Sequence, residues 1–290
     1  MNIGIVGCGI MGLSIARNCA RAGFAVFGFD TDPERAAMLR QAGGTPCASA
    51  AEVAAAAEIV LTSLPSIAAL DQTAAALASV ARRGQIMCEL STLPTDVKQR
   101  NHDLLAGAGI VMLDCPLSGT GAQAETGDLV VLASGDMAAF ERARHVFAGF
   151  ARLAHHVGPF GHGMKMKIVA NLLVAIHNVA SAEAMVLGMK AGLDPDAIVK
   201  VIGSGAGTSR VFELRAPLMA ANAYEPPTMK CDIWQKDMAI IGAYATSLGV
   251  AAPTFFATVP IYNAAIAQGH GGADTAAVCA VLEGMAGIAR

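Results

Sequence analysis

The sequence predicts an α/β protein in which a doubly wound, mostly parallel sheet is followed by an all-α domain, the two joined through a long central helix. Short apolar runs alternate with helical patterns up to about residue 160, as in a parallel sheet covered on both faces. Beyond Gly161 strand signals stop, and a proline-free apolar segment, Met164–Ala191, begins. We therefore expect a sheet domain over residues 1–162 and a helical domain over residues 163–290.

The first strand, Asn2–Val6, runs into a glycine-rich turn, Gly7-Cys8-Gly9-Ile10-Met11-Gly12, and a helical pattern over residues 13–22 follows. A strand before and a helix after make this spacing the fingerprint of a Rossmann-type dinucleotide site. The glycines let backbone approach a pyrophosphate, and the helix start supplies unpaired N–H groups. We assign Gly7, Gly9, Ile10, Met11 and Gly12 to cofactor binding. The alternative is an ordinary tight turn.

The second strand, Ala25–Phe29, ends at Asp30, where an acidic residue can accept hydrogen bonds from the adenosine ribose diol. A carboxylate there would repel the 2′-phosphate of NADP, and Thr31-Asp32-Pro33 offers no arginine to receive it. The prediction is therefore NAD in preference to NADP. In the alternative interpretation, Asp30 or Asp32 only caps the next helix, with Pro33 in its first turn.

Further patterns continue the alternation. Ser49 and Glu52 have the spacing of a capping box at a helix start. Strand patterns cover residues 58–64, 85–90 and 110–114, and helical patterns cover residues 67–80 and those from Pro94. Because ligands gather at the carboxyl ends of parallel strands, we expect Leu64, Pro65 and Thr92 to line one crevice with the glycine turn. For Thr92, a helix cap is an equally good interpretation.

Residues 115–127 have neither a helical nor a strand period, so we expect a loop that is either disordered or ligand-binding. Ser118 and Gly119 offer a hydroxyl and free N–H groups that can hold a carboxylate. The alternative is a plain connecting loop.

The apolar segment opens with two lysines and an asparagine. Lys167 and Asn171 stand four residues apart and share a helix face, whereas Lys165 points nearly opposite. Aliphatic residues occur on nearly every side, which predicts a helix buried on all faces. A buried ammonium and amide need partners, so the spacing selects Lys167 and Asn171 to face a cleft. In the alternative, both lysines extend to solvent from the first turn.

The second half has helical patterns only. They cover residues 195–203, 209–221, 233–248, 253–268 and 273–287. Lys236 and Asp237 fall in the third of these patterns and, taken alone, indicate surface charge.

Composition excludes several functional classes. A net charge of −3 leaves no basic excess for nucleic acid or an anionic membrane. The seven cysteines are scattered without a Cys-x-x-Cys pair, which favours buried thiols in a reducing compartment and hence a cytoplasmic protein. Neither cysteines nor histidines have metal-ligand spacing, so we expect no metal site.

A strand starting at the second residue leaves no room for a leader, and Asn171 and His177 interrupt any membrane span. The apolar, charge-poor helical half favours a homodimer or homotetramer.

Four motifs in order give the whole chain a resemblance to the β-hydroxyacid dehydrogenases. This family contains 3-hydroxyisobutyrate dehydrogenase and tartronate semialdehyde reductase and is more distantly related to 6-phosphogluconate dehydrogenase. The motifs are Gly7-x-Gly9-x-Met11-Gly12, Asp114-x-Pro116-x-Ser118-Gly119 followed by Gly127, Gly161-x-Gly163-x-x-x-Lys167-x-x-x-Asn171, and Lys236-Asp237.

The resemblance implies a reversible NAD-dependent oxidation of a small β-hydroxy acid, or reduction of the corresponding semialdehyde. It implies that Lys167 is the general acid/base, that Asn171 orients it, and that Ser118 and Gly119 bind the substrate carboxylate. Lys236 would contact both substrate and cofactor from the helical domain.

Two positions depart from the family pattern. Thr120 stands where a second glycine is usual, so we add it to the residues that contact substrate, and Ala170-Asn171 replaces a common Asn-Asn pair. Two other functions stay open. An imine reductase on the same scaffold tends to carry another residue at the lysine position, and a non-catalytic nucleotide-sensing module has no need for Lys167 and Asn171.

Overall fold

The computed structural model describes residues 1–80 and 82–290. The chain forms two compact units, Met1–Lys167 and Ile168–Arg290. The division falls inside helix α8 (His162–Lys190), five residues beyond the predicted boundary at residue 162, where that helix begins. The expected combination of a parallel sheet, a helical second half and a long helix between them is confirmed.

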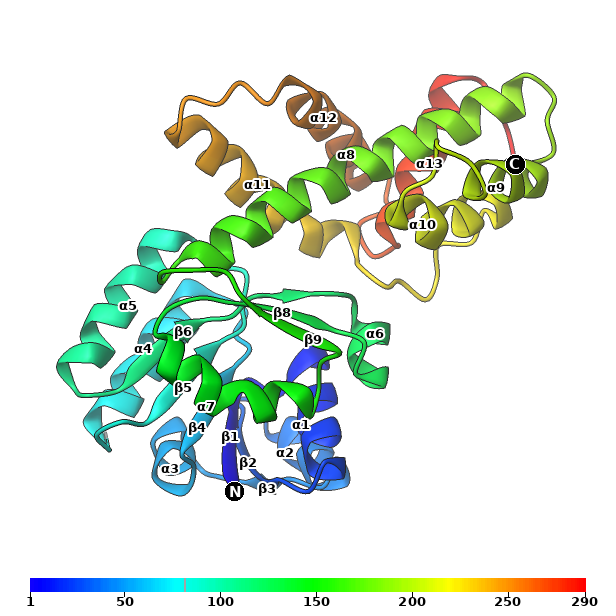
Figure 1. The fold of residues 1–290 in the computed structure, drawn as a ribbon. Helices are drawn as coiled ribbons and strands as arrows, with labels where there is room; N and C mark the ends of the chain where they lie inside the picture. The colour runs from blue at the N-terminus through cyan, green and yellow to red at the C-terminus, as the bar shows by residue number, and fades with distance from the viewer. Residues whose placement is uncertain (81) are drawn as a thin grey trace. The chain divides into compact units, whose positions relative to one another are not determined.

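The first unit is built on a six-stranded sheet in the order β3-β2-β1-β4-β5-β6 (Figure 1). Every neighbouring pair is parallel. The strands are β1 (Asn2–Val6), β2 (Ala25–Phe29), β3 (Thr45–Pro46), β4 (Ile59–Thr62), β5 (Ile86–Glu89) and β6 (Val111–Asp114). The strand order reverses between β1 and β4, so the carboxyl ends of these two strands flank the position where doubly wound sheets bind ligands.

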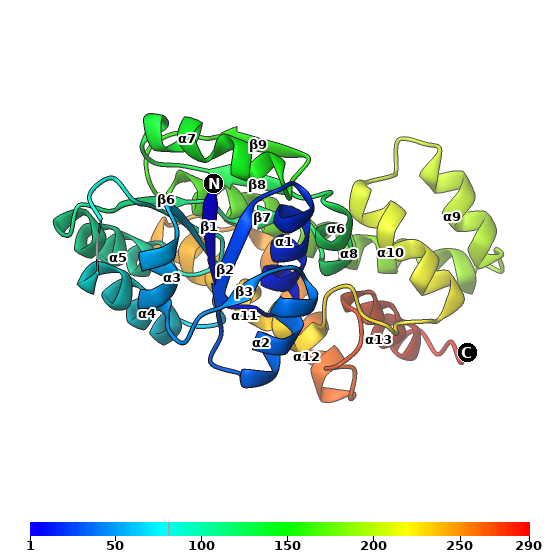
Figure 2. The ribbon, with the colours of Figure 1, turned by 90° about the horizontal axis from the view of Figure 1, so that it is seen from below.

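Helices cover both faces of this sheet. They are α1 (Ile10–Arg21), α2 (Pro33–Gln41), α3 (Ala50–Ala56), α4 (Ile67–Ser79) and α5 (Thr95–Gly107). Along β1, Ile3 and Ile5 join the core under α1, whereas Val6 joins the core under α3, α4 and α5. Figure 2 shows these two groups of helices on opposite sides of the strands. The near-continuous apolar character of the strands follows from this burial on both faces.

The capping box at Ser49 is confirmed as a helix start, with one difference in its return bond. The Ser49 hydroxyl accepts from Glu52 N–H at 3.1 Å, whereas Glu52 Oε2 accepts from Ala48 N–H at 2.8 Å rather than from Ser49.

A second, smaller sheet follows in the order β7-β8-β9. It contains β7 (Leu117–Ser118), β8 (Val130–Ala133) and β9 (Leu153–His156), with helices α6 (Gly121–Thr126) and α7 (Met137–Ala148) between them. The prediction of an irregular loop over residues 115–127 is therefore wrong. Thr120 and Gln123 form a reciprocal capping box that starts α6, and Gly127, at φ 73°, ends it. A two-residue strand and a six-residue helix are too short to show a period.

The second unit is helical, as predicted. After α8 it contains α9 (Pro195–Gly203), α10 (Arg210–Ala221), α11 (Cys231–Ser247), α12 (Pro253–Ala267), the short 3-10 helix η1 (Thr275–Ala277) and α13 (Val278–Met285). In place of the single helix predicted over residues 273–287, η1 starts where Asp274 accepts from the N–H of Ala276, and α13 follows it directly.

The prediction that α8 is buried on all faces is wrong for this chain. Met166, Val169 and Leu187 are 45%, 56% and 73% exposed, so apolar residues lie on a surface of the helix. Within the described residues, α8 is the one helix whose length and apolar composition would allow it to cross a membrane. Core helices of globular domains meet the same criterion, and Asn171 and Asn178 of α8 hydrogen-bond to other parts of the second unit.

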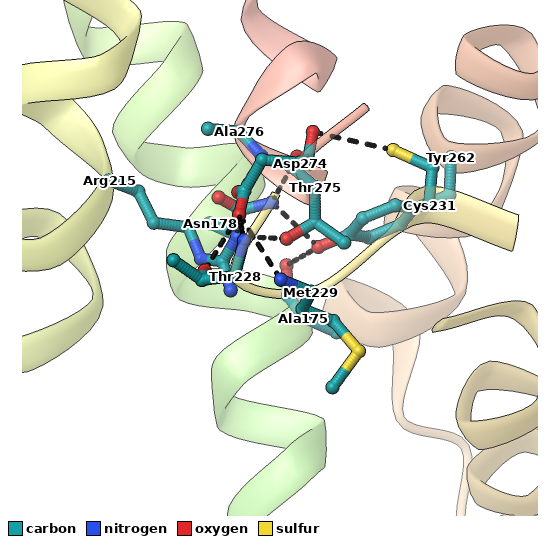
Figure 3. A network of polar contacts seen from close by, with 10 residues as sticks. All are labelled: Ala175, Asn178, Arg215, Thr228, Met229, Cys231, Tyr262, Asp274, Thr275 and Ala276. Atoms are coloured by element: carbon teal, nitrogen blue, oxygen red, sulfur yellow. Dashed lines mark hydrogen bonds and ion pairs between the residues drawn. The ribbon is translucent and has the colours of Figure 1, made fainter. Parts of the chain in front are cut away.

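A buried polar network holds the second unit together (Figure 3). The Asp274 carboxylate pairs with Arg215 and accepts from the Thr228 N–H and hydroxyl, each at 2.7 Å. Asn178 Nδ2 donates to the Tyr262 hydroxyl at 3.0 Å and to the Thr275 carbonyl at 2.9 Å. Burial raises the pKa of Asp274, but Arg215 and the hydrogen bonds outweigh it, so the pKa lies below its ordinary value. The network joins α8, α10, α12 and η1.

Candidate active site

The glycine turn lies between β1 and α1, at the carboxyl end of the sheet. Gly7 has φ 91°, and a Cβ there would lie 2.1 Å from the Ser63 carbonyl oxygen. A Cβ on Gly12 would lie 1.9 Å from the Gly7 carbonyl oxygen, so α1 packs directly on the turn. A Cβ on Gly9 would meet no atom of residues 1–80 and 82–290 within 4 Å. Gly7 and Gly12 are therefore required by the fold, whereas Gly9 faces open space.

The start of α1 suits an anionic group. Gly9 is its N-cap, and no side chain in the described part of the chain caps this end through a hydrogen bond. Ile10, the first helical residue, is 68% exposed, and Met11 follows it. Free N–H groups at a helix start, with open space beside Gly9, fit the pyrophosphate of a dinucleotide.

Asp30 fixes the glycine turn to the end of β2. Its Oδ2 accepts from Cys8 N–H at 2.6 Å, and its Oδ1 accepts from Asp32 N–H at 2.9 Å. Asp32, and not Asp30, caps α2, by accepting from Glu34 N–H. The remaining acceptor positions of the Asp30 carboxylate suit a ribose diol. Burial, with the Asp30 charge, raises the pKa of the Cys8 thiol to about 12, so Cys8 stays protonated at neutral pH.

The ends of β4 and β5 are joined beside this turn. Leu64 N–H donates to the Ser91 hydroxyl at 2.7 Å, and the Leu64 side chain lies close to Gly7. Pro65 is exposed and Thr92 half-buried. The N-cap of α5 is Pro94, so the alternative in which Thr92 caps that helix does not hold. The carboxyl ends of β1, β4 and β5 thus present the predicted cofactor residues along one edge of the sheet.

The predicted substrate segment adjoins the glycine turn. A Cβ on Gly121, the first residue of α6, would lie 3.1 Å from Ile10 Cγ2. Ser118 ends β7, and Gly119 has φ 143° with no room for a Cβ beside Leu129. The Thr120 hydroxyl accepts from Gln123 N–H, so this side chain serves the α6 cap.

Helix α8 carries the predicted catalytic pair. Lys165 is exposed, Lys167 is half-buried, and Asn171 is only 5% exposed, as the helical spacing predicts. Lys167 is the last residue of the first unit, and Asn171 lies one helical turn further on.

In the second unit, Asn171 Nδ2 donates to Asp237 Oδ2 at 2.9 Å, and both residues are buried. A carboxylate only accepts hydrogen bonds, so the amide nitrogen has to face Asp237 and the amide oxygen is turned away from it. An amide oxygen held in this way can accept from an ammonium or a hydroxyl. Lys236, next to Asp237 on α11, is exposed. The resemblance places Asp237 in the Lys236-Asp237 motif, whereas the buried hydrogen bond of Asp237 to Asn171 is found only in the structure.

Family models match both halves of the chain. The model for the NAD binding domain of 6-phosphogluconate dehydrogenase matches residues 2–158. The model described as NAD-binding of NADP-dependent 3-hydroxyisobutyrate dehydrogenase matches residues 161–282.

Individual relatives extend over almost the whole chain. L-threonate dehydrogenase of Cupriavidus necator is 35% identical over 98% of this chain and 97% of that protein. A crystal structure of 3-hydroxyisobutyrate dehydrogenase from Salmonella typhimurium has a TM-score of 0.85 and 31% identity, covering 97% of this chain and 99% of that one. The 3-hydroxyisobutyrate dehydrogenase of Mycobacterium tuberculosis with L-serine has a TM-score of 0.89 and 28% identity, covering 97% and 98%.

The matched domains, the identity over the full length and the glycine turn at the switch point agree with one another. The chain therefore belongs to the β-hydroxyacid dehydrogenase family, with a 6-phosphogluconate dehydrogenase-like NAD-binding domain, and is an NAD(P)-dependent dehydrogenase acting on CH–OH donors.

Proposed function

We propose that this enzyme reversibly oxidises a small β-hydroxy acid of the sugar-acid type, with L-threonate as the first candidate, and uses Lys167 as general acid/base. The observation that carries the proposal is the pair on α8. Lys167 is half-buried on the face of Asn171, one turn away, whereas Lys165 points to solvent. The 35% identity to an L-threonate dehydrogenase supports the choice of the first substrate.

A bound nicotinamide supplies the acceptor or donor of a hydride. Lys167 Nζ would take the proton of the substrate hydroxyl during oxidation and return it during reduction. Asn171, held by Asp237, would orient that ammonium or the substrate hydroxyl through its amide oxygen. Ser118 and the backbone at Gly119 and Thr120 would bind the carboxylate, and Lys236 would contact substrate and cofactor.

We also propose that the enzyme prefers NAD to NADP. Asp30, fixed by the N–H groups of Cys8 and Asp32, supports this proposal because its carboxylate stands at the end of β2, where an acidic residue would accept from the ribose diol of NAD. Asp32 adds a second negative charge beside it, and the neighbouring Arg35 lies 3.6 Å from that same Asp32. A 2′-phosphate would meet more negative than positive charge here.

Assembly and location complete the proposal. We propose a homodimer or homotetramer formed through the helical unit, supported by exposed Leu173, Leu187 and Val201. We propose a cytoplasmic location, supported by seven free cysteines. Sedimentation velocity tests the first, and fractionation of cells that produce the protein tests the second.

The experiment is a spectrophotometric screen of hydroxy acids and semialdehydes with NAD and NADP in parallel, on the wild type, Lys167→Ala and Lys165→Ala. We expect Lys167→Ala to lose at least about a hundredfold in turnover, the scale of general acid/base catalysis, with NAD affinity within about twofold. Lys165→Ala should resemble the wild type. Loss in Lys165→Ala with an active Lys167→Ala would overturn the assignment. A cyclic imine reduced faster than every semialdehyde would favour an imine reductase, and tight NAD binding without turnover on any compound would favour a nucleotide sensor.

A further inference from the structure

A fully buried ion network lies at the carboxyl edge of the large sheet, outside all four sequence motifs except at Asp114. Lys98 of α5 has no exposed side-chain surface. Its Nζ lies 2.6 Å from Glu89 Oε2 at the end of β5 and 2.7 Å from Asp114 Oδ1 at the end of β6. Burial lowers the pKa of Lys98, but Asp114 and Glu89 raise it by more, so the ammonium stays charged at the pH of any ordinary assay.

The network reaches the first turn of α8. Asp114 Oδ2 accepts from Met164 N–H at 2.7 Å, and the Ser134 hydroxyl accepts from Gly163 N–H at 2.8 Å. Gly161, which precedes α8 at φ 85°, has no side chain with which to cap it. The acceptors that a helix start requires are therefore supplied by distant strand ends. The negative charge of Asp114 also lies at the positive end of the α8 dipole.

The start of α8 packs tightly against β6 and β8. A Cβ on Gly163 would lie 2.3 Å from the Leu132 carbonyl oxygen and 2.6 Å from that of Asp114. Gly163 is four residues before Lys167, so Lys167 lies one helical turn beyond the residue that is held here and on the same face of α8.

The other end of the network reaches the edge of the sheet where the predicted cofactor residues lie. Glu89 Oε1 accepts from Ser91 N–H at 2.9 Å, and the Ser91 hydroxyl accepts from Leu64 N–H at 2.7 Å. A continuous series of ion pairs and hydrogen bonds thus connects the ends of β4, β5 and β6 to α8. Replacing a buried ion pair by apolar side chains is often neutral or stabilising. Stability alone therefore does not account for this network.

We propose that Lys98, Asp114 and Ser134 are positioning residues. They fix the start of α8, and with it Lys167 one turn further on, against the edge of the sheet where the predicted cofactor residues lie. The inference rests on the proposed role of Lys167. It predicts that loosening the helix start lowers kcat and leaves the KM for NAD almost unchanged, because Leu64 and the glycine turn keep their own contacts.

The test uses the intact enzyme and its best substrate from the screen, with Ser134→Ala as the main variant and Lys98→Met as the second. Ser134→Ala removes the acceptor for Gly163 N–H and, with it, the hydroxyl that lies 3.3 Å from both the Asp114 carbonyl oxygen and Asp114 Oδ2. The matched control is Gln85→Met. Gln85 is also buried and donates to the Ala54 and Ala57 carbonyls at 2.7 and 2.8 Å, but it lies at the opposite end of β5. A displaced catalytic group can cost up to about a hundredfold in rate, and for the loss of this one hydroxyl we expect about tenfold in kcat.

A double-mutant cycle separates positioning from general damage. If Ser134 acts through Lys167, then Ser134→Ala lowers kcat in the wild type, leaves the KM for NAD within about twofold, and has no further effect on the residual rate of Lys167→Ala. Gln85→Met should keep the wild-type kcat even if it lowers the melting temperature as much as Ser134→Ala does.

Two results would overturn the inference: an equal loss from Ser134→Ala in both backgrounds, or an equal loss of kcat in Gln85→Met. If Lys98→Met does not fold, Ser134→Ala decides the question. A fully active Lys167→Ala would instead refute the proposed catalytic lysine, a result that the same cycle reveals separately.

Discussion

Two glycines of the β1–α1 turn, Gly9 and Gly12, predict different effects for the same added methyl group. In Gly9→Ala the added methyl enters open space in the free protein, and the backbone at φ −69° is allowed for alanine. Gly9 is the N-cap of α1, where glycine is better than alanine, so we expect unfolding to become easier by no more than about 1 kcal/mol. The fold should therefore tolerate the substitution.

The same substitution should weaken the binding of NAD. The methyl occupies the space through which backbone N–H groups reach the pyrophosphate, and a hydrogen bond to a charged group contributes about 1.5–3 kcal/mol. Losing one such bond weakens NAD binding by about 10- to 150-fold. Gly12→Ala is the control, because its methyl would lie 1.9 Å from the Gly7 carbonyl oxygen. Overpacking of this kind costs about 1–3 kcal/mol of stability.

Isothermal titration calorimetry with NAD and thermal unfolding of both variants test this contrast. Gly9→Ala should keep the wild-type melting temperature within a few degrees and lose affinity, and Gly12→Ala should lose both. If Gly9→Ala binds NAD as tightly as the wild type, the dinucleotide does not lie against this turn, and the assignment of the cofactor site is refuted.

Two further predictions concern charge. Asp30→Asn should raise the ratio of NADP to NAD turnover at least about tenfold, since removing one of two closely spaced like charges is worth more than about 1.4 kcal/mol. Asp32→Asn is its matched control, and an equal change there would show that Asp30 has no special position. In the second unit, the lowered pKa of Asp274 means that its ionised form stabilises the fold above about pH 3.8, and that this stability is lost as the pH falls through the folded pKa. The urea midpoint of Asp274→Asn should therefore fall well below that of the wild type at pH 7, and the gap should narrow as the pH falls below about 3.8 through the folded pKa; a gap that is independent of pH would contradict the assignment.

The sequence was sufficient for the larger elements of the fold. Buried parallel strands are continuous apolar runs, so β1 and β2 were predicted with their observed bounds, and β4, β5 and β6 were predicted with a few extra residues. The short elements β7 and α6 were missed, although Thr120 and Gln123 have the capping-box spacing that could have located α6.

Which faces of α8 are buried could not be predicted. An apolar helix surface has the same sequence pattern whether it packs inside one chain or between chains. Spacing alone placed Lys167 and Asn171 on one face and Lys165 on another, because helical geometry is local. The partners of Asn171 and of the α8 start depend on contacts between distant segments. A signal for Lys98 was nevertheless present, since it shares the buried face of α5 with Asn101 and Leu105.

The dependence of α8 on Asp114 and Ser134 has a consequence for biosynthesis. Both residues leave the ribosome before any part of α8, and domains generally fold as units with the N-terminal one first. The first turn of α8 then meets acceptors that are already in place. In a circular permutant that begins at α8, this helix would be translated before Asp114 and Ser134. Its first backbone N–H groups would then have no acceptors until the two sheets had formed.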